Sequence, residues 1–295
     1  MTTFLDIPLP LIFGQLLIGA INGAFYALLS LGLAIIFGML HIVNFAHGAL
    51  FMLGAFVAWM LMYYGGIGYW WALLLVPLIV GAFGMVLERT IIRRLYKNDL
   101  IYGVLLTFGI TLMLESLFRN AYGTTGMSYP EPQSMAFAFD LGFMFLPAYR
   151  AWVIVVSAVV CLAIWFAIER TRLGATLRAA TENAALVQAF GVNVPRLIMF
   201  TYAGGIALAG FAGVLAAPIY TVSPMMGSNL VIVVFAVVVI GGMGSILGSI
   251  VTGFGLGVLE GLVKVFYPEG SGMVVFIVMI VVLVVRPAGL FGRAV

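Results

Sequence analysis

The sequence has little charge and almost no cysteine. Asp, Glu, Lys and Arg together make up 8% of its 295 residues, whereas 64% are hydrophobic and the mean hydropathy is +1.24. A water-soluble domain needs about a quarter of its residues charged to cover its surface, so a soluble fold is excluded. The single cysteine, Cys161, lies in an apolar run and has no partner for an internal disulfide.

Catalytic and nucleotide-binding motifs are absent as well. The sequence contains no HExxH, GxSxG or Walker A motif. Its two histidines, His41 and His47, have no Cys, Asp or Glu in the same stretch to complete a metal site. The net charge of +3 rests on few ionisable groups and gives no sign of nucleic-acid binding. We therefore expect that this chain is not an enzyme and that it holds no catalytic site, no metal and no cofactor.

Long hydrophobic runs are what the sequence has instead. Each run is near the length of about 20 residues that crosses a bilayer as a helix, and the runs lack the alternating pattern of a membrane barrel. The sequence therefore predicts an all-α, polytopic membrane protein with eight or nine transmembrane helices in a single domain, residues 1–295. The apolar segments are residues 11–40, 42–64, 69–87, 100–120, 151–168, 197–217, 230–243, 246–266 and 273–285.

Lysine and arginine are unevenly distributed among the connections. Because cytoplasmic loops carry the excess of these residues, the side with more of them is expected to be cytoplasmic. This places residues 169–196 and the C-terminus in the cytoplasm, and nine crossings would place the N-terminus outside. Arg119, Arg150 and Lys264 lie opposite or buried, and the other ten lie on one side: Arg89, Arg93, Arg94, Lys97, Arg170, Arg172, Arg178, Arg196, Arg286 and Arg293.

The connection formed by residues 169–196 is too polar for lipid and too rich in helix formers for a linker. An amphipathic helix lying on lipid would need a Lys-rich polar face, which this stretch lacks, so we expect a helical element that docks on another protein. Alanines keep its surface low, and the apolar contacts would come from Leu177, Leu186, Val187 and Phe190.

The ends of this docking element are marked in the sequence. Gly191 suits a left-handed helix end, and Pro195 suits the start of the next helix. Thr181 could instead cap a shorter helix that begins at Glu182. The sequence therefore leaves one helix or two open.

Two short stretches interrupt the apolar runs, one in each half of the chain. The first is residues 41–48 and the second is residues 241–248. Taken singly, the first stretch favours a tight turn with satisfied side chains and the second favours close helix packing. Broken helices in corresponding positions of two halves are typical of a transporter, so the pair indicates a translocation path. The candidate path residues are Asn44, His47, Gly48, Gly241, Gly242, Gly244 and Ser245.

Two further features carry expectations. Glu115 and Arg119, and likewise Glu260 and Lys264, lie four residues apart on predicted helices, a spacing that favours ion pairs over proton coupling. The long external connection, residues 121–149, is either a segment folded against the outer mouth, where it could meet a partner, or a simple spacer.

Three parts of the sequence resemble the ABC-importer permeases of the branched-chain amino acid class, the LivH type. They are NGAFYALLSLGLAIIFGMLHIVNFAHGALFMLGAF at residues 22–56, RAATENAALVQAFGVNVPRLIMFTYAGGIALAGFAGVLAAPI at residues 178–219, and the C-terminal RPAGLFG. The resemblance spans nearly the whole chain. Where the broader importer pattern has Glu-Ala-Ala followed by Gly, this chain has Glu182-Asn183-Ala184-Ala185 with Gly191 further on.

This resemblance implies a permease subunit of the bacterial inner membrane that forms half of a path for branched-chain or related hydrophobic amino acids. It also implies ATP use by nucleotide-binding ATPase subunits, a second, LivM-like permease subunit and a periplasmic substrate-binding protein. Alternatives are a permease of this type for urea or short amides, or a self-sufficient channel or secondary transporter, which would not need the docking element. The expected ATPase-docking residues are Arg178, Thr181, Glu182, Asn183, Ala184, Ala185, Gln188 and Gly191.

Overall fold

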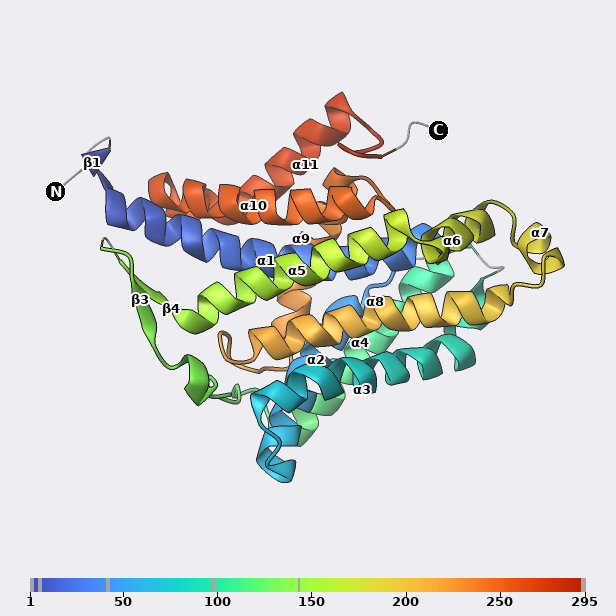
Figure 1. The fold of residues 1–295 in the computed structure, drawn as a ribbon, viewed down its shortest axis with the longest axis horizontal. Helices are drawn as coiled ribbons and strands as arrows, with labels where there is room; N and C mark the ends of the chain where they lie inside the picture. The colour runs from blue at the N-terminus through green and yellow to red at the C-terminus, as the bar shows by residue number, and fades with distance from the viewer. Residues whose placement is uncertain (1–2, 5–6, 41–42, 97–98, 143, 293–295) are drawn as a thin grey trace.

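A computed structural model describes residues 3–4, 7–40, 43–96, 99–142 and 144–292. Almost all of its regular structure is helical, which confirms the all-α prediction (Figure 1). Four short strands form two antiparallel pairs, β1 (Thr3–Phe4) with β2 (Ile7–Pro8) and β3 (Ala138–Asp140) with β4 (Phe145–Pro147). The helices are α1 (Leu9–Leu40), α2 (Ala46–Gly65), α3 (Tyr69–Thr90), α4 (Leu100–Tyr122), α5 (Ala148–Arg170), α6 (Arg172–Glu182), α7 (Ala184–Ala189), α8 (Val194–Ala216), α9 (Met226–Gly241), α10 (Ile246–Phe266) and α11 (Val274–Val285), with 3-10 turns η1 (Ile92–Leu95), η2 (Gln133–Met135) and η3 (Pro268–Met273).

In the described part of the chain, eight helical segments are long and apolar enough to cross a membrane, counting η3 with α11, and α9 is a shorter apolar helix of 16 residues. These nine correspond to the nine apolar segments expected from hydropathy. The largest differences are in where segments begin: α2 begins at Ala46 rather than at residue 42, α9 at Met226 rather than at 230, and the last segment at Pro268 rather than at 273. The N-terminus and the hairpin β3–β4 lie at one end of the bundle, and α6 and α7 lie at the other (Figure 1).

Glycines bring α1 and α10 together over most of their length. A Cβ atom on Gly257 would lie 2.3 Å from the Cα of Gly23, and one on Gly19 would lie 2.5 Å from the Gly257 carbonyl oxygen. Small residues let helix backbones approach closely, and this packing replaces the hydrophobic driving force that lipid removes. Gly253 and Gly257 both lie in this close packing, whereas Gly255 faces open space.

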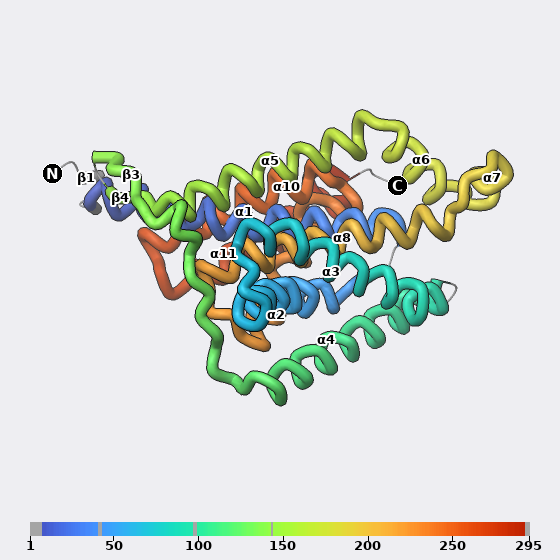
Figure 2. The backbone as a smooth tube through the Cα atoms, turned by 60° about the horizontal axis from the view of Figure 1, so that its bottom comes forward, coloured from blue at the N-terminus to red at the C-terminus, as the bar shows by residue number. Residues whose placement is uncertain are grey.

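Helix α8 packs against α2 and α3 in the same way. A Cβ atom on Gly54 would lie 2.5 Å from the Gly210 carbonyl oxygen, and Gly84 lies against the side chain of Ile206. By contrast, α4 lies at the edge of the bundle (Figure 2). It buries a stripe that contains Thr107, Thr111 and Glu115 and exposes its other faces. The core therefore centres on α1, α2, α8 and α10.

The external connection folds against the end of the bundle. Met127 pairs with Val222 in both directions, with N–O distances of 2.8 and 3.0 Å. Next to this pair, α5 bonds to α8 and α3: the Tyr149 hydroxyl donates to the Leu215 carbonyl at 2.9 Å, and Trp152 donates its indole N–H to the Tyr69 hydroxyl at 3.2 Å. The segment is thus more than a spacer, and its contact with a partner stays a prediction.

The two ion pairs expected from the sequence, Glu115 with Arg119 and Glu260 with Lys264, do not form. Glu115 accepts a hydrogen bond from Ser228 on α9, and Glu260 accepts one from Tyr26 on α1 at 2.9 Å. Neither carboxylate forms a salt bridge, because both turn inward to neighbouring helices instead of along their own helix. Spacing alone shows which groups can meet but not which face of the helix is buried.

The basic residues divide between the two ends of the bundle as the sequence predicts. Arg119 ends α4, Arg150 starts α5, and Lys264 is in the last turn of α10, so these three lie at the end with β3 and β4. Lys97 and Arg293 are outside the described residues. At the end with α6 and α7 lie Arg89, Arg93, Arg94, Arg170, Arg172, Arg178, Arg196 and Arg286.

Candidate functional site

The docking element consists of two helices, α6 and α7, separated by Asn183. Asn183 caps α7, because its side-chain oxygen accepts the Leu186 N–H at 2.9 Å. Thr181 lies inside α6 and donates its hydroxyl to the Arg178 carbonyl at 2.7 Å. The alternative of two helices is therefore correct, but the capping residue is Asn183 and not Thr181.

A small hydrophobic core fixes α6 and α7 against the start of α8. It consists of the buried side chains of Ala180, Val187 and Val194. Val187 therefore supports the element from inside. The expectation that Val187 belongs to the apolar contact surface is wrong. Gly191 has φ = 85°, which confirms the expected left-handed position, and Asn193 caps α8 by accepting the Arg196 N–H at 3.1 Å.

Arg178 joins the docking element to the transmembrane body. Its guanidinium donates to the Ile168 carbonyl at 3.2 Å and forms an ion pair with Glu169 at 3.4 Å. Both side chains are about half exposed, so the pair adds little energy, but it fixes how α6 leaves the end of α5. A force on α7 would therefore reach α5 through this contact and α8 through the small core.

The free face of α7 carries apolar side chains outside the transmembrane helices. Phe190 is 79% exposed and Leu186 is 55% exposed, and the neighbouring alanines Ala184, Ala185 and Ala189 are exposed as well. Exposed apolar side chains that cluster beside polar residues are typical of interaction surfaces. We define the coupling surface by its exposed residues Glu182, Ala184, Ala185, Leu186, Gln188, Ala189 and Phe190.

The first interruption is a turn between α1 and α2. His41 and Ile42 lie outside the described residues. Asn44 is fully buried, accepts the Ala46 N–H at 3.1 Å and donates to the Tyr202 hydroxyl at 3.3 Å. His47 is also buried, with its ring close to Gly32. These contacts match a tight turn with satisfied Asn44, and a role of this stretch in the path stays a prediction.

Gly48 and the second interruption are both places of close backbone packing. A Cβ atom on Gly48 would lie 2.6 Å from the Gly227 carbonyl oxygen, and one on Gly241 would lie 2.7 Å from the Gly248 carbonyl carbon. Ser245 caps α10 by accepting the Gly248 N–H at 3.1 Å.

Gly242 and Gly244, at φ = 100° and 85°, complete the turn between α9 and α10. The C-terminal segment docks on this turn. Leu290 donates its backbone N–H to Ile240 at 2.8 Å, and Phe291 donates to Gly241 at 3.1 Å. The second interruption therefore holds the C-terminal segment in place, and its contact with a transported solute stays a prediction.

A polar pocket, which the sequence reasoning missed, lies between α1 and the start of α9. Its volume is about 360 Å³. The Tyr220 hydroxyl donates to the Asn22 side-chain oxygen at 2.8 Å, and Tyr26 donates to Glu260 behind the pocket wall. The sequence feature that could have indicated this pocket was the carboxylate of Glu260 on a predicted transmembrane helix, which the sequence analysis assigned to an ion pair. Asn22, Tyr26, Tyr220, Thr221, Ser223, Met226, Asn229 and Leu230 line the pocket.

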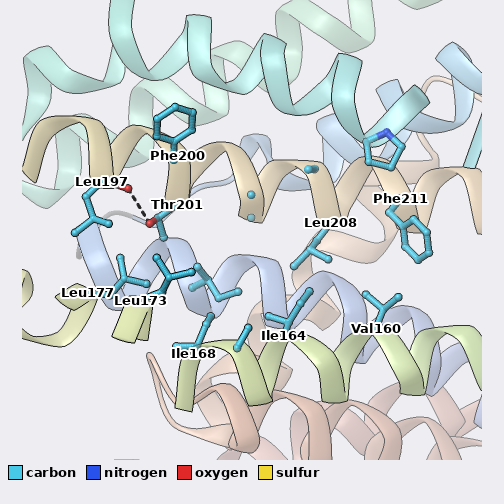
Figure 3. Close-up of a pocket in the computed structure, with 16 residues that line it drawn as sticks. Val160, Ile164, Ile168, Leu173, Leu177, Leu197, Phe200, Thr201, Leu208 and Phe211 are labelled. Carbon is cyan, nitrogen blue, oxygen red and sulfur yellow. Dashed lines mark hydrogen bonds between the residues drawn. The ribbon is translucent and has the colours of Figure 1, made fainter. Parts of the chain in front are cut away.

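A larger groove of about 620 Å³ lies between α5 and α8 (Figure 3). Its walls are apolar side chains such as Ile164, Leu208 and Phe211. The hydroxyl of Thr201, its one polar side chain, donates back to the Leu197 carbonyl at 2.8 Å. Nothing in this groove could hold a polar solute, so it suits an acyl chain or an apolar side chain of a neighbouring helix.

Comparisons with known proteins bear on the whole chain. Residues 15–283 match the family "Branched-chain amino acid transport system / permease component". The chain is 28% identical, over 95% of each chain, to the high-affinity branched-chain amino acid transport system permease protein LivH of Escherichia coli and to BraD of Pseudomonas aeruginosa. It is 27% identical to the permease protein LivM of Escherichia coli, over 90% of this chain and 67% of LivM. No solved structure matches the chain significantly.

Proposed function

Since this chain belongs to the branched-chain amino acid transport permease family, we propose that it forms half of the translocation path of an ATP-driven importer for branched-chain or related hydrophobic amino acids. It is a multi-pass membrane protein and a permease subunit of an ABC importer. The observation that supports the proposal is the coupling surface, an exposed face with two large apolar side chains that lies outside the transmembrane helices of a chain that matches the family over nearly its full length.

The coupling surface receives the movement of a nucleotide-binding ATPase subunit. The sequence has no Walker A motif, so we assign ATP hydrolysis to such a partner. Arg178 transmits displacement of the surface to α5, and the core around Val187 transmits it to α8. Because α8 packs through glycines against α2 and α3, a shift of α8 moves the centre of the bundle. ATP is thus bound by the partner and not by this chain.

A second permease subunit completes the path. The chain resembles proteins named LivH and a protein named LivM, which supports a pair of related permeases in one transporter. A periplasmic substrate-binding protein delivers the amino acid to the end of the bundle that carries β3 and β4. The excess of arginine at the other end supports a cytoplasmic position for α6, α7 and the C-terminus, in the bacterial inner membrane.

The proposal is tested by placing a charged side chain in the coupling surface. Ala185→Arg inserts a long cation where a partner would need close contact, so the complete transporter in proteoliposomes should lose ATP-driven leucine uptake while the permease remains folded. Thr90→Arg, on an exposed residue at the end of α3 and outside the coupling surface, is the control and should transport normally. Normal uptake by the Ala185 variant would contradict the role of α7. Uphill transport by the permease without an ATPase would contradict the importer itself.

A further inference from the structure

The polar pocket between α1 and α9 is unusual for its surroundings. It lies between α1, which is long and apolar enough to cross a membrane, and the shorter apolar helix α9, yet hydroxyl and amide groups make up much of its wall. Polar side chains at this depth are costly against lipid and therefore face protein or a water-filled cavity. Asn229 illustrates this, because it is exposed on α9 and its side chain makes no hydrogen bond within the described chain. The pocket therefore offers the unpaired Asn229 side chain to water or to a polar solute.

The pocket lies at the end of the bundle away from the coupling surface. Tyr220 and Thr221 belong to the connection between α8 and α9, which pairs with the external segment through Met127 and Val222. Arg150, at the start of α5, lies near the same rim. In the importer proposed above, this is the side that faces the substrate-binding protein, so the pocket is where a delivered amino acid first meets the permease.

The charges around the pocket suit a zwitterion. Glu260 has no ion pair in the described chain, and its one hydrogen bond comes from Tyr26, which lines the pocket. Burial, as the largest cause, and the Glu260 carboxylate both raise the pKa of the Tyr220 hydroxyl, and Arg150 opposes the rise. Both a negative and a positive group therefore act at this site. An α-amino acid carries an ammonium for the first and a carboxylate for the second.

The size and the rest of the lining agree with this solute. A volume of about 360 Å³ falls within the range of about 300–1,000 Å³ typical of small-molecule pockets. Met226 and Leu230 supply an apolar wall beside the polar groups, as a branched aliphatic side chain requires. A urea or short amide has no net ammonium for Glu260 to attract.

We propose that this pocket binds the amino acid on its way through the permease, with the Tyr26 oxygen accepting from the ammonium group, Glu260 supplying negative charge from behind Tyr26, and the amide N–H groups of Asn22 and Asn229 donating to the carboxylate. The proposal rests on the importer function above and adds to it. The permease itself then selects for the head group of an amino acid, in addition to any selection by the binding protein.

The first test neutralises the carboxylate in the complete transporter. Glu260→Gln keeps the shape of the side chain and an acceptor for Tyr26, so the fold should hold while the half-saturating concentration for leucine uptake rises by about tenfold or more. Glu115→Gln is the matched control, because Glu115 is likewise a helix carboxylate bonded to one hydroxyl, that of Ser228, and it lies outside the pocket lining. It should transport leucine within twofold of the unmodified protein.

The second test asks whether the pocket is open to water from outside. In a Cys161→Ala background, Asn229→Cys should react with a charged methanethiosulfonate added to spheroplasts, and added leucine-loaded binding protein with ATP should slow the reaction. Val159→Cys, 58% exposed on α5, should not react because it faces lipid. This readout does not depend on transport by the Glu260 variant.

The outcomes separate the two proposals. A wild-type complex that takes up no leucine when ATPase subunits and binding protein are present would overturn the importer function. Active wild-type complex together with unchanged leucine uptake by Glu260→Gln, or with an unreactive Asn229→Cys, would overturn the pocket and leave the importer standing. An equal loss in Glu115→Gln and Glu260→Gln would also overturn the pocket, because the effect would then be common to hydrogen-bonded carboxylates in these helices.

Discussion

Removing the two large apolar side chains of the coupling surface should weaken binding of the ATPase subunit. The change is the double substitution Leu186→Ala and Phe190→Ala. Fully burying a side chain of this size contributes about 1.5–3 kcal/mol. Phe190 is 79% exposed and Leu186 is 55% exposed, so burial by a partner removes most of the first and about half of the second from water.

The expected loss follows from these fractions. Phe190 contributes about 2 kcal/mol and Leu186 about 1 kcal/mol to the contact. Together they correspond to a Kd about 100-fold higher for the ATPase subunit. The permease itself should keep its stability, since Val187 still fills the small core and alanine is the best helix former at position 186.

The assay is titration of the detergent-solubilised permease pair with purified ATPase subunit, beside a thermal unfolding measurement of each variant. Phe166→Ala on α5 is the matched control, because Phe166 is 59% exposed and faces lipid within a transmembrane helix. It should leave the Kd unchanged. A Kd within threefold of the unmodified value for the double variant, with both proteins folded, would show that α7 is not the docking surface.

Two further predictions concern the fold. Gly257→Val should lower the thermal unfolding temperature in detergent by several degrees, because its Cβ would overlap Gly23, whereas Gly255→Val, next to open space, should have little effect; equal shifts would contradict the close packing of α1 and α10. Asn183→Ala should cost about 1 kcal/mol by removing the cap of α7, seen as faster hydrogen exchange of the Leu186 amide with unchanged global unfolding; unchanged exchange would show that the cap does not hold α7.

Much of this protein follows from the sequence. The apolar runs predict the nine apolar helices of the described chain, because a backbone in lipid must satisfy its own hydrogen bonds. In a helix these bonds join residues only a few positions apart in the sequence. The position of the docking element and its ends at Gly191 and Pro195 also follow from local backbone preferences. These features need no knowledge of which helix lies beside which.

Tertiary structure decided the contacts between helices. Glu260 could reach Lys264 by spacing, but the helix turns it toward Tyr26, and Asn22 meets Tyr220 only because the connection after α8 folds back over α1. Likewise, Val187 is buried because α8 lies beneath α7. The face that a helix buries depends on its neighbours far along the chain, so the polar pocket exists only once those helices are assembled.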